Sequence, residues 1–437
     1  MLKIKEYYVR KLNPQKEYEI QVPGSKSITN RALLLAALSN YKCCLTGVLF
    51  SDDTRGFLDC LIQLGFEVEI EEERCRVTIT GTGGIIPRKK ATIDVRSAGT
   101  AARFLTVVLA FAGGDYQLNA SEQMQKRPME PVLKILENMK VKFRYNNEKY
   151  HFPFEMSSPI MDEEQEEIIT VDTGLSSQFA SALLMASCLL PKGARIHMTG
   201  VRTEGSYIKM TLEMMKQFGI RVEREGTEST GYRIGHQKEW GLETYEIEPD
   251  VSAACYFYAM APLLKTNVIV KGVHEDSLQG DIQFLHVLEK MGCEKEETPK
   301  GIRMKGREAA LHGVDVSMKD FSDQVMTLAA IAPFADAPST IRNIGHIRFQ
   351  ESDRIHAIVT ELTRMGILCE EDMKIDGIRI EPGEVKDTRV NTYEDHRMAM
   401  AFTLPGLRTG KITILNPDCC RKTFENYFSV IDSLYHD

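Results

Sequence analysis

Six short polar segments of the chain each stand directly before an almost wholly apolar segment. They are Gly24-Ser25-Lys26-Ser27, Ser97-Ala98-Gly99-Thr100, Ser176-Ser177-Gln178, Asp250-Val251-Ser252, Ser322-Asp323-Gln324 and Glu394-Asp395-His396-Arg397. A helix start presents unpaired N–H groups and about half a positive charge, so small residues there admit phosphate or carboxylate. Ordinary N-capping explains Ser, Thr and Asp at any one of these places equally well. The segments therefore indicate six helix starts, and anion binding is one of two interpretations of them.

Positively charged residues in or beside these segments favour the anion-binding interpretation. They are Lys26, Arg31, Arg103, Arg127, Arg354, Arg397 and Lys422. Guanidinium groups bind carboxylate and phosphate through paired hydrogen bonds, whereas a solvated surface more often alternates cations with carboxylates. We therefore expect a multiply anionic substrate. The string GTGG at residues 81–84 opens no helix and lacks the Walker lysine, so it predicts a glycine turn and not a nucleotide site.

The apolar segments that follow the polar ones predict buried helices. They are NRALLLAAL, AARFLTVVLA, QFASALLMASCLL, SAACYFYAMAPLL, QVMTLAAIAPFA and HRMAMAFTLPGL. A second phrase, an amphipathic helix followed by a turn and a polar-alternating strand, recurs about every 75 residues. Its turn residues are Gly65, Lys140, Gly219, Gly292 and Gly366. Glycine suits such a turn because the position after a helix often needs a positive φ.

Short β-branched segments between the helices, such as RVTIT, RIHMTG, NVIVKG, STIRNI and KITILN, predict strands. One buried helix, one amphipathic helix and these strands make a repeated α/β unit, and six units in two domains give three in each. The last helix, near FENYFSVIDSLY, is followed by no strand, whereas the run YEIQVPG near the amino terminus could supply one. We therefore expect both termini in one domain, with the other domain inserted.

Bulk properties exclude several classes of protein. A chain of 437 residues is long enough for two domains, and 54 basic against 62 acidic residues argue against a nucleic-acid partner. The sequence shows no signal peptide and no apolar run long enough to span a bilayer, which predicts a cytoplasmic protein without a membrane partner. The ten cysteines include no C-x-x-C spacing, which argues against zinc or a redox couple.

The segment VPGSKSITNRALLLAAL resembles the opening motif of EPSP synthases, and the similarity runs through nearly the entire chain. Further matches are AGTAARFL, QKRPMEP, SSQFASALLM, SLQGDIQFLHVLEKMG, SDQVMT, ESDRIHA, EDHRMAM and KTFENYF. The resemblance implies an α/β fold of two inside-out domains, each with three repeated βαβαββ-type units. The expected domains are residues 1–22 with 247–437, and residues 23–246, with the active site in the cleft between them.

The resemblance also implies a reaction, the transfer of the enolpyruvyl group of phosphoenolpyruvate to the 5-hydroxyl of shikimate 3-phosphate. By that resemblance, the residues on the phosphoenolpyruvate side are Lys26, Gly99, Arg127, Gln178, Arg354, Arg397 and Lys422. Those on the acceptor side are Lys26, Ser25, Arg31, Ser176, Ser177, Gln178, Tyr207, Asp323 and Gln350. We expect a glyphosate-binding monomer that needs neither metal nor organic cofactor.

Enolpyruvyl transfer needs proton donors and acceptors on both sides of the donor. We assign Asp323 as the base toward the acceptor hydroxyl and Glu351 as the carboxyl nearest the methylene carbon. Lys26 would bridge both substrates and be available for proton transfer. The arginines and Lys422 would stabilise the donor carboxylate and the departing phosphate. His396 could polarise the donor, and a structural hydrogen bond is an equally good interpretation of it.

Several positions depart from the family pattern. Glu204 stands for the usual serine near the acceptor phosphate, His346 and Gln350 for asparagine and lysine, Ser97 for asparagine and Phe104 for proline. A glutamate beside that phosphate costs ~1–4 kcal/mol unless Arg202 or another cation offsets it. One interpretation is local realignment, with Thr203 or Ser206 supplying the hydroxyl and Arg348 the cation; the other is a changed acceptor. Phe104, close behind Gly99, also suggests an altered response to glyphosate.

Three alternatives stay open at this point. A UDP-N-acetylglucosamine enolpyruvyl transferase usually carries a cysteine in the loop that corresponds to residues 115–127, and DYQLNASEQMQKR has none. An enolpyruvyl transferase for another phosphorylated or carboxylated acceptor would keep the donor side and alter the acceptor side. A non-catalytic anion-binding relative would not need Asp323, Glu351 and Lys422.

Overall fold

The computed structural model describes residues 5–159, 166–174, 176–200, 203–225, 231–307 and 310–435. The chain forms two compact units. Unit 1 comprises Met1–Pro23 and Glu248–Asp437, and unit 2 comprises Gly24–Ile247. None of the helices within the described residues is long and apolar enough to cross a membrane.

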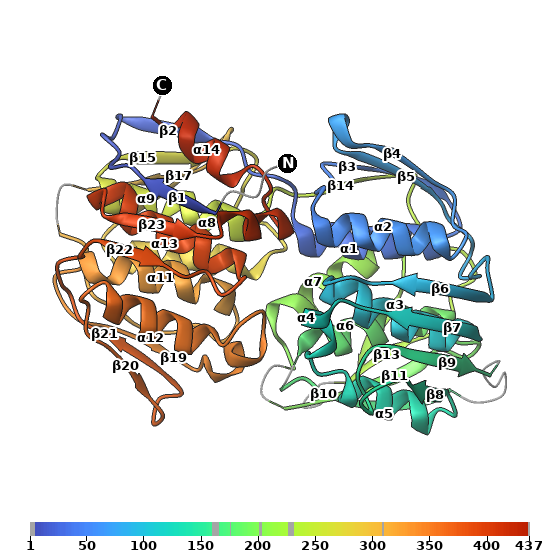
Figure 1. The fold of residues 1–437 in the computed structure, drawn as a ribbon. Helices are drawn as coiled ribbons and strands as arrows, with labels where there is room; N and C mark the ends of the chain where they lie inside the picture. The colour runs from blue at the N-terminus through green and yellow to red at the C-terminus, as the bar shows by residue number, and fades with distance from the viewer. Residues whose placement is uncertain are drawn as a thin grey trace. The chain divides into compact units, whose positions relative to one another are not determined.

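Unit 2 contains three four-stranded sheets built on one plan (Figure 1). In spatial order the first sheet is β14 (Thr244–Glu246), β3 (Lys42–Thr46), β5 (Arg76–Thr80) and β4 (Val68–Glu71). The second is β6 (Lys90–Asp94), β7 (Gly114–Asn119), β9 (Phe154–Ser158) and β8 (Lys142–Tyr145). The third is β10 (Glu167–Asp172), β11 (Ala194–Thr199), β13 (Gly231–Ile234) and β12 (Val222–Glu225). In each sheet the first two strands are parallel and the other neighbours antiparallel.

Unit 1 repeats the same plan, with one change in its last sheet. The first sheet is β2 (Glu17–Ile20), β15 (Asn267–Val270), β17 (Gly301–Lys305) and β16 (Glu294–Thr298). The second is β18 (Asp315–Ser317), β19 (Ser339–Arg342), β21 (Gly377–Ile380) and β20 (Cys369–Asp372). The third has only β22 (Thr388–Val390), β23 (Ile412–Leu415) and β1 (Glu6–Val9). The predicted partner for the last unit was wrong in detail: the YEI residues form β2 and pair with β15, and the earlier strand β1 pairs with β23.

Two kinds of helix alternate along each unit. The first kind is α1 (Lys26–Leu38), α3 (Gly99–Ala112), α6 (Ser177–Ala186), α8 (Val251–Tyr258), α11 (Val325–Ile331) and α13 (His396–Thr409). The second kind is α2 (Asp52–Gln63), α5 (Glu130–Asn138), α7 (Ser206–Gln217), α10 (Phe284–Lys290) and α12 (Arg354–Arg364). Shorter helices are α4 (Glu122–Gln125), α9 (Met260–Leu264) and α14 (Tyr427–Ser433).

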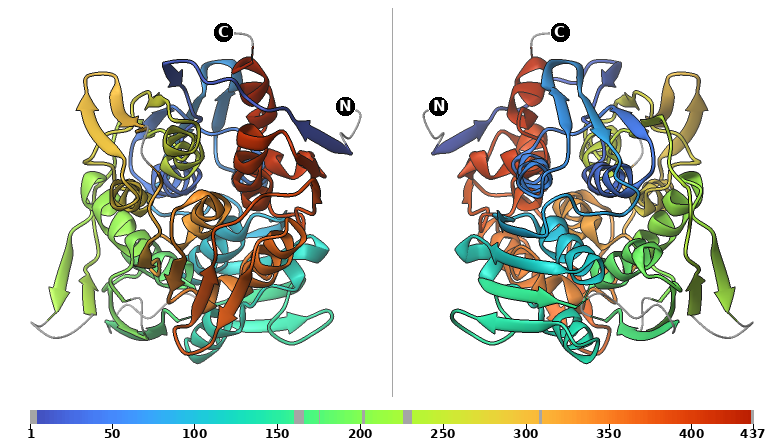
Figure 2. Two further views of the ribbon diagram at one scale, coloured as in Figure 1. Left: turned by 90° about the vertical axis from the view of Figure 1, so that its left-hand side faces the viewer. Right: turned by 90° about the vertical axis from the view of Figure 1, so that its right-hand side faces the viewer.

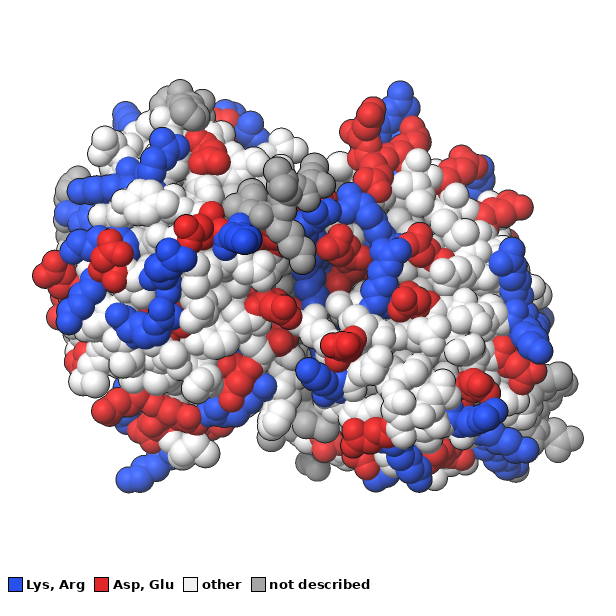
Figure 3. Space-filling model, in the orientation of Figure 1, with Lys and Arg blue, Asp and Glu red and all other residues white. Residues whose placement is uncertain are grey.

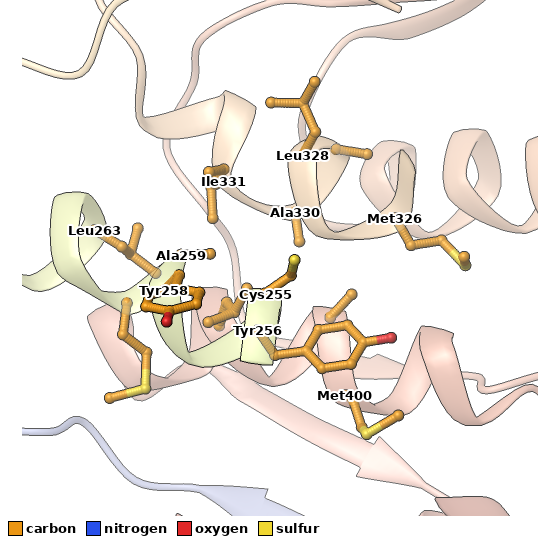
Figure 4. Packing of buried hydrophobic residues seen from close by; sticks show 14 of the residues in the cluster. Cys255, Tyr256, Tyr258, Ala259, Leu263, Met326, Leu328, Ala330, Ile331 and Met400 are labelled. Atoms are coloured by element: carbon orange, nitrogen blue, oxygen red, sulfur yellow. The ribbon is translucent and has the colours of Figure 1, made fainter. Parts of the chain in front are cut away.

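Helices of the first kind form the interior of each unit because they are apolar all round. Every residue of α11 is buried, and α13 packs against it. In the close view, Cys255 of α8 lies near Ala330 of α11, and the ring of Tyr256 lies near Met400 of α13 (Figure 4). Helices of each unit are seen nearly end-on in Figure 2, with strands of the same unit around them. The predicted inside-out α/β fold of repeated units is thus confirmed, and the described strands include all five predicted segments.

The recurrent turn has the predicted backbone conformation in all its copies. Gly65, Gly219, Gly292 and Gly366 have φ values of 92°, 84°, 103° and 82°. Lys140 adopts the same left-handed region with φ 67°, although a side chain there is sterically disfavoured. Each turn joins an amphipathic helix to the next strand, which fixes the register of the repeat.

Around these units, cationic and anionic side chains are interspersed on the visible face (Figure 3).

Candidate active site

The six polar segments lie where the sequence predicts them, at helix starts. Five begin α1, α3, α6, α8 and α13, and Ser322–Gln324 forms the 3-10 turn η4 that leads into α11. Three of the helices, α6, α8 and α13, have a side-chain oxygen that caps the first turn in the expected way for Ser or Asp, as Asp395 does for the N–H of Arg397. Ser25 and Ala98, in contrast, make no side-chain cap. Their first N–H groups are the better candidates for an external anion.

In unit 2, Gly99 leaves room for two guanidinium groups at the start of α3. A Cβ added at Gly99 would lie 2.7 Å from Nη1 of Arg127 and 3.0 Å from Nη1 of Arg103. Arg103 is buried and donates a hydrogen bond of 2.5 Å to Oε1 of Gln178 at the start of α6. The starts of α3 and α6 are therefore tied together by an arginine, with Arg127 beside them.

Also in unit 2, Lys26 at the start of α1 has a carboxylate neighbour. Its Nζ lies 3.5 Å from Oδ2 of Asp53, and both side chains are largely buried. Asn30, one turn further along α1, donates to Oγ1 of Thr100 at 2.5 Å. These contacts orient the start of α1 with respect to α2 and α3.

Arg31 is the most deeply buried cation of unit 2, with an exposed fraction of 1%. Its Nε donates to Thr211 at 2.8 Å, its Nη2 to Ser181 at 3.1 Å, and its guanidinium lies 5.4 Å from the ring centroid of Phe104. Burial lowers the pKa of Arg31 to about 10, so it still carries its charge near neutral pH. Arg31 thus joins α1, α6 and α7 and places a positive charge beneath the start of α6. Phe104 is itself fully buried, so an effect of this residue on glyphosate would have to act through its neighbours.

In unit 1, Asp323 is held between two arginines from different helices. Its Oδ1 accepts from Nη1 of Arg354 at 3.0 Å, and its Oδ2 accepts from Nη2 of Arg397 at 2.7 Å. Arg354 begins α12 and Arg397 lies in the first turn of α13. Three helix starts of unit 1 therefore converge on one carboxylate.

Asp395 binds the other side of the Arg354 guanidinium group that holds Asp323. Arg354 donates through Nε to Asp395 at 2.8 Å, and neither side chain is exposed by more than 2%. Burial works against ionisation of Asp395, but the Arg354 guanidinium lowers the pKa of that carboxyl below its usual value. Burial also works against the charge of Arg354, whereas Asp395 and Asp323 raise its pKa. Both groups stay ionised, and the pair fixes the direction in which Arg354 points.

Glu351 and Lys422 form a second ion pair in unit 1. Nζ of Lys422 lies 2.7 Å from Oε2 of Glu351, and about a tenth of each side chain is exposed. Nδ1 of His396 is 3.9 Å from the same carboxylate and 4.0 Å from Asp395. The predicted carboxyl, cation and histidine of the donor side thus lie together.

Sequence reasoning missed a buried polar network behind Asp323. Asp281 accepts a 2.8 Å hydrogen bond from Nε2 of Gln324, the residue after Asp323, and is also hydrogen-bonded to Ser252 at the start of α8. Burial raises the pKa of Asp281 to about 6; the Asp323 carboxylate adds to the rise and Arg397 opposes it. Asp281 belongs to the SLQGD string, where a polar residue in a loop gives no sign of burial.

A family comparison decides between the open interpretations of this site. The family described as EPSP synthase (3-phosphoshikimate 1-carboxyvinyltransferase) matches residues 12–431. The chain belongs to the EPSP synthase family. It is therefore an enzyme of the enolpyruvyl transferase kind, and the interpretation as UDP-N-acetylglucosamine enolpyruvyl transferase falls away.

Individual members of the family agree over nearly the whole length. The chain is 40% identical over 418 residues to the 3-phosphoshikimate 1-carboxyvinyltransferase of Trichormus variabilis, covering 96% of each chain. It is 38% identical over 414 residues to that of Escherichia coli, covering 94% of each. A solved EPSP synthase structure from Acinetobacter baumannii has a TM-score of 0.81 at 22% identity and covers 99% of this chain and 98% of that one. The last likeness supports the fold.

Most departures from the EPSP synthase pattern have partners in the structure. Glu204 pairs with Arg224 of β12, which supplies the offsetting cation; Arg202 lies outside the described residues. His346 is 2.8 Å from the hydroxyl of Ser322, and Gln350 accepts from Nη1 of Arg354. Their partners are therefore residues next to, or bonded to, Asp323.

The proposed realignment at Arg348 finds less support, because this side chain already has two carboxylate partners. It donates to Asp353 at 3.1 Å and also pairs with Glu371. Gln350, and not Arg348, is the residue beside Arg354.

Proposed function

We propose that this member of the EPSP synthase family transfers the enolpyruvyl group of phosphoenolpyruvate to the 5-hydroxyl of shikimate 3-phosphate, using one set of anion-binding groups from each unit. The observation that carries the proposal is the Asp323 carboxylate held between Arg354 and Arg397 at three helix starts. The products would be 5-enolpyruvylshikimate 3-phosphate and phosphate. Membership of the family supports this acceptor over a changed one.

On the donor side, phosphoenolpyruvate would bind through its carboxylate and phosphate. The cations of unit 1 would be Arg354, Arg397 and Lys422. Unit 2 would contribute the cations Lys26 and Arg127, together with N–H groups at Gly99 and Gln178. In unit 1 these cations already bind Asp323 and Glu351. An incoming anion would compete with Asp323 for guanidinium hydrogen bonds, which would free that carboxylate to act as a base.

On the acceptor side, Ser25, Ser176, Ser177, Gln178 and Tyr207 would bind the phosphate and hydroxyls of shikimate 3-phosphate. Arg31 would add long-range attraction from its buried position. Asp323 would accept the proton of the 5-hydroxyl, and Gln350 would hold Arg354 in place through their hydrogen bond.

The reaction would run in two halves. In the first, the incoming phosphate draws Lys422 away from Glu351, which takes up a proton from solvent and delivers it to C3 of phosphoenolpyruvate. Positive charge develops at C2, and the 5-oxygen bonds to C2 while Asp323 takes its proton. In the second, the C2–O bond to phosphate breaks and C3 returns its proton to Glu351. Lys422 and the arginines stabilise the departing phosphate, and Lys26 is available to pass a proton to it.

The experiment is phosphate release by the purified protein with phosphoenolpyruvate and shikimate 3-phosphate. Asp323→Asn should lower kcat by about 100-fold to 10,000-fold, the usual range for loss of a general base. Asp387→Asn, an exposed aspartate, is the matched control and should behave as wild type. If shikimate 3-phosphate gives no phosphate release and another acceptor does, the proposed acceptor is contradicted. If the protein binds phosphoenolpyruvate and releases no phosphate with any acceptor, catalysis is contradicted.

We further propose that the enzyme works as a cytoplasmic monomer whose units draw together on both substrates. Free thiols at all ten cysteines fit a reducing compartment. Light scattering should give a mass near 49.4 kDa, and small-angle scattering should show compaction when both substrates are present. A dimer mass would contradict the monomer, and an unchanged scattering curve would contradict the proposed movement of the units.

A further inference from the structure

The loop that delivers Asp395 and Arg397 has an unusual backbone. Tyr393 and Glu394 are consecutive residues with φ of 54° and 56°, and the N–H of Asp395 donates to the carbonyl of Thr392 at 2.8 Å. Two left-handed central residues closed by this hydrogen bond make a type I′ turn, which strongly favours Gly, Asn and Asp. Tyrosine and glutamate are costly there, so neighbouring contacts must hold the turn.

A buried carboxylate on α12 provides these contacts. Glu361 has no exposed side-chain surface, and its Oε1 accepts from the hydroxyl of Tyr393 at 2.8 Å and from Nδ2 of Asn391 at 3.3 Å. Arg364, two-fifths exposed, lies 2.7 Å from its other oxygen and neutralises the charge. Burial and the hydrogen bond to Glu361 raise the pKa of Tyr393 to about 12, so this hydroxyl remains a donor.

The same two helices are joined at their starts by the ion pair of Arg354 and Asp395. α12 therefore contacts the loop before α13 twice, once through Arg354 and once, about two helical turns later, through Glu361. The first contact involves substrate-binding groups directly. The second lies away from them and touches only the turn.

We propose that Glu361 is a positioning residue for enolpyruvyl transfer, which holds the Tyr393–Glu394 turn so that Asp395 and Arg397 face the donor. The inference rests on the proposed function, because it assigns the turn a role in binding phosphoenolpyruvate. Loss of the contact lets the turn relax toward right-handed conformations, which displaces the start of α13. A displacement of about 1 Å at such a site can cost about 100-fold in rate.

The test compares Tyr393→Phe, Glu361→Met, the double variant and Arg364→Lys with wild type. Methionine removes both carboxylate oxygens, so that Tyr393 loses its acceptor. Tyr393→Phe and Glu361→Met should each lower kcat/KM for phosphoenolpyruvate by about 10-fold to 100-fold, chiefly through KM, and leave KM for shikimate 3-phosphate unchanged. The double variant should be no worse than Glu361→Met, because both changes break one contact. Arg364→Lys keeps a cation beside the same buried carboxylate without touching the turn, and should stay within about twofold of wild type.

Either of two results would overturn the inference: wild-type kinetics for Tyr393→Phe, or equal losses for Arg364→Lys. If Glu361→Met does not fold, Tyr393→Phe carries the test alone, since it keeps the carboxylate and its arginine. An inactive wild-type protein would instead contradict the proposed function and would be seen before any variant is compared.

Discussion

Replacing Asp281 by asparagine should make the stability of the protein less dependent on pH. The Asp281 carboxyl is buried among Ser252, Gln324 and, at longer range, Asp323 and Arg397. Burial raises its pKa from an ordinary 3.8 to about 6. Asparagine has nearly the same shape and keeps an oxygen that can accept from Gln324, so the substitution removes the titration and little else.

The magnitude follows from the two pKa values. Between pH 3.8 and about 6 the folded protein keeps the proton of Asp281, whereas the unfolded chain has released it. The free energy of unfolding of the wild type therefore falls as pH rises through this window. A pKa change of one is worth ~1.4 kcal/mol, so the whole fall is ~3 kcal/mol. The part between pH 5 and pH 8 is about 1 to 2 kcal/mol.

Urea unfolding of wild type and Asp281→Asn at several pH values between 5 and 8 measures this difference. The variant should gain about 1 to 2 kcal/mol relative to wild type as pH rises, because it lacks the buried charge. Asp276→Asn, on the exposed part of the same loop, is the matched control and should give a flat difference. A flat difference for Asp281→Asn as well, or one that falls with pH, would refute the reasoning.

Three further predictions concern the acceptor side, the repeat and the donor side. Arg224→Gln should raise KM for shikimate 3-phosphate about threefold to tenfold, because it leaves Glu204 without its cation. Adding the change Glu204→Ser should return KM to the wild-type value. An unchanged KM in Arg224→Gln would mean that Glu204 lies away from the acceptor. Lys140→Gly should raise the free energy of unfolding by about 1 kcal/mol and Gly219→Ala should lower it by a similar amount, since both turns have positive φ. Urea titration measures both changes, and changes of the same sign would contradict the shared turn conformation. Lys422→Met should lower kcat/KM for phosphoenolpyruvate by about 100-fold or more, because the departing phosphate loses a cation; a steady-state assay that shows less than a tenfold loss would count against this role.

The repeat and the helix starts could be predicted from the sequence because they depend on local rules. Each buried helix is apolar all round, each start is marked by small polar residues, and each turn needs a left-handed residue. These signals are contained in short stretches of chain, so they survive without knowledge of the fold. Lys140 shows their limit: its φ of 67° follows from its place in the period and not from its residue type.

Strand partners and polar networks could not be predicted in the same way, because they join distant parts of the chain. The run YEI looked suited to complete the last sheet, yet β2 pairs with β15 and β1 completes that sheet instead. Both runs have the alternation of an edge strand, and only the closure of the whole unit distinguishes them. Asp281 and Glu361 were missed for a related reason, since their burial depends on which repeat they meet.

The groups of unit 1 that we propose to be catalytic are oriented by contacts that cross from one repeat to the next. Arg354 begins α12, which packs against β20 of its own repeat, and is held by Asp395 from the α13 repeat. Gln324, next to Asp323, is held by Asp281 from the α8 repeat. A helix start by itself fixes N–H groups, whose direction depends on the backbone alone, but long guanidinium and carboxylate side chains need a partner to lose their freedom. Stacked repeats place such partners side by side. A substitution in one repeat should therefore change the orientation of the proposed catalytic group in the neighbouring repeat.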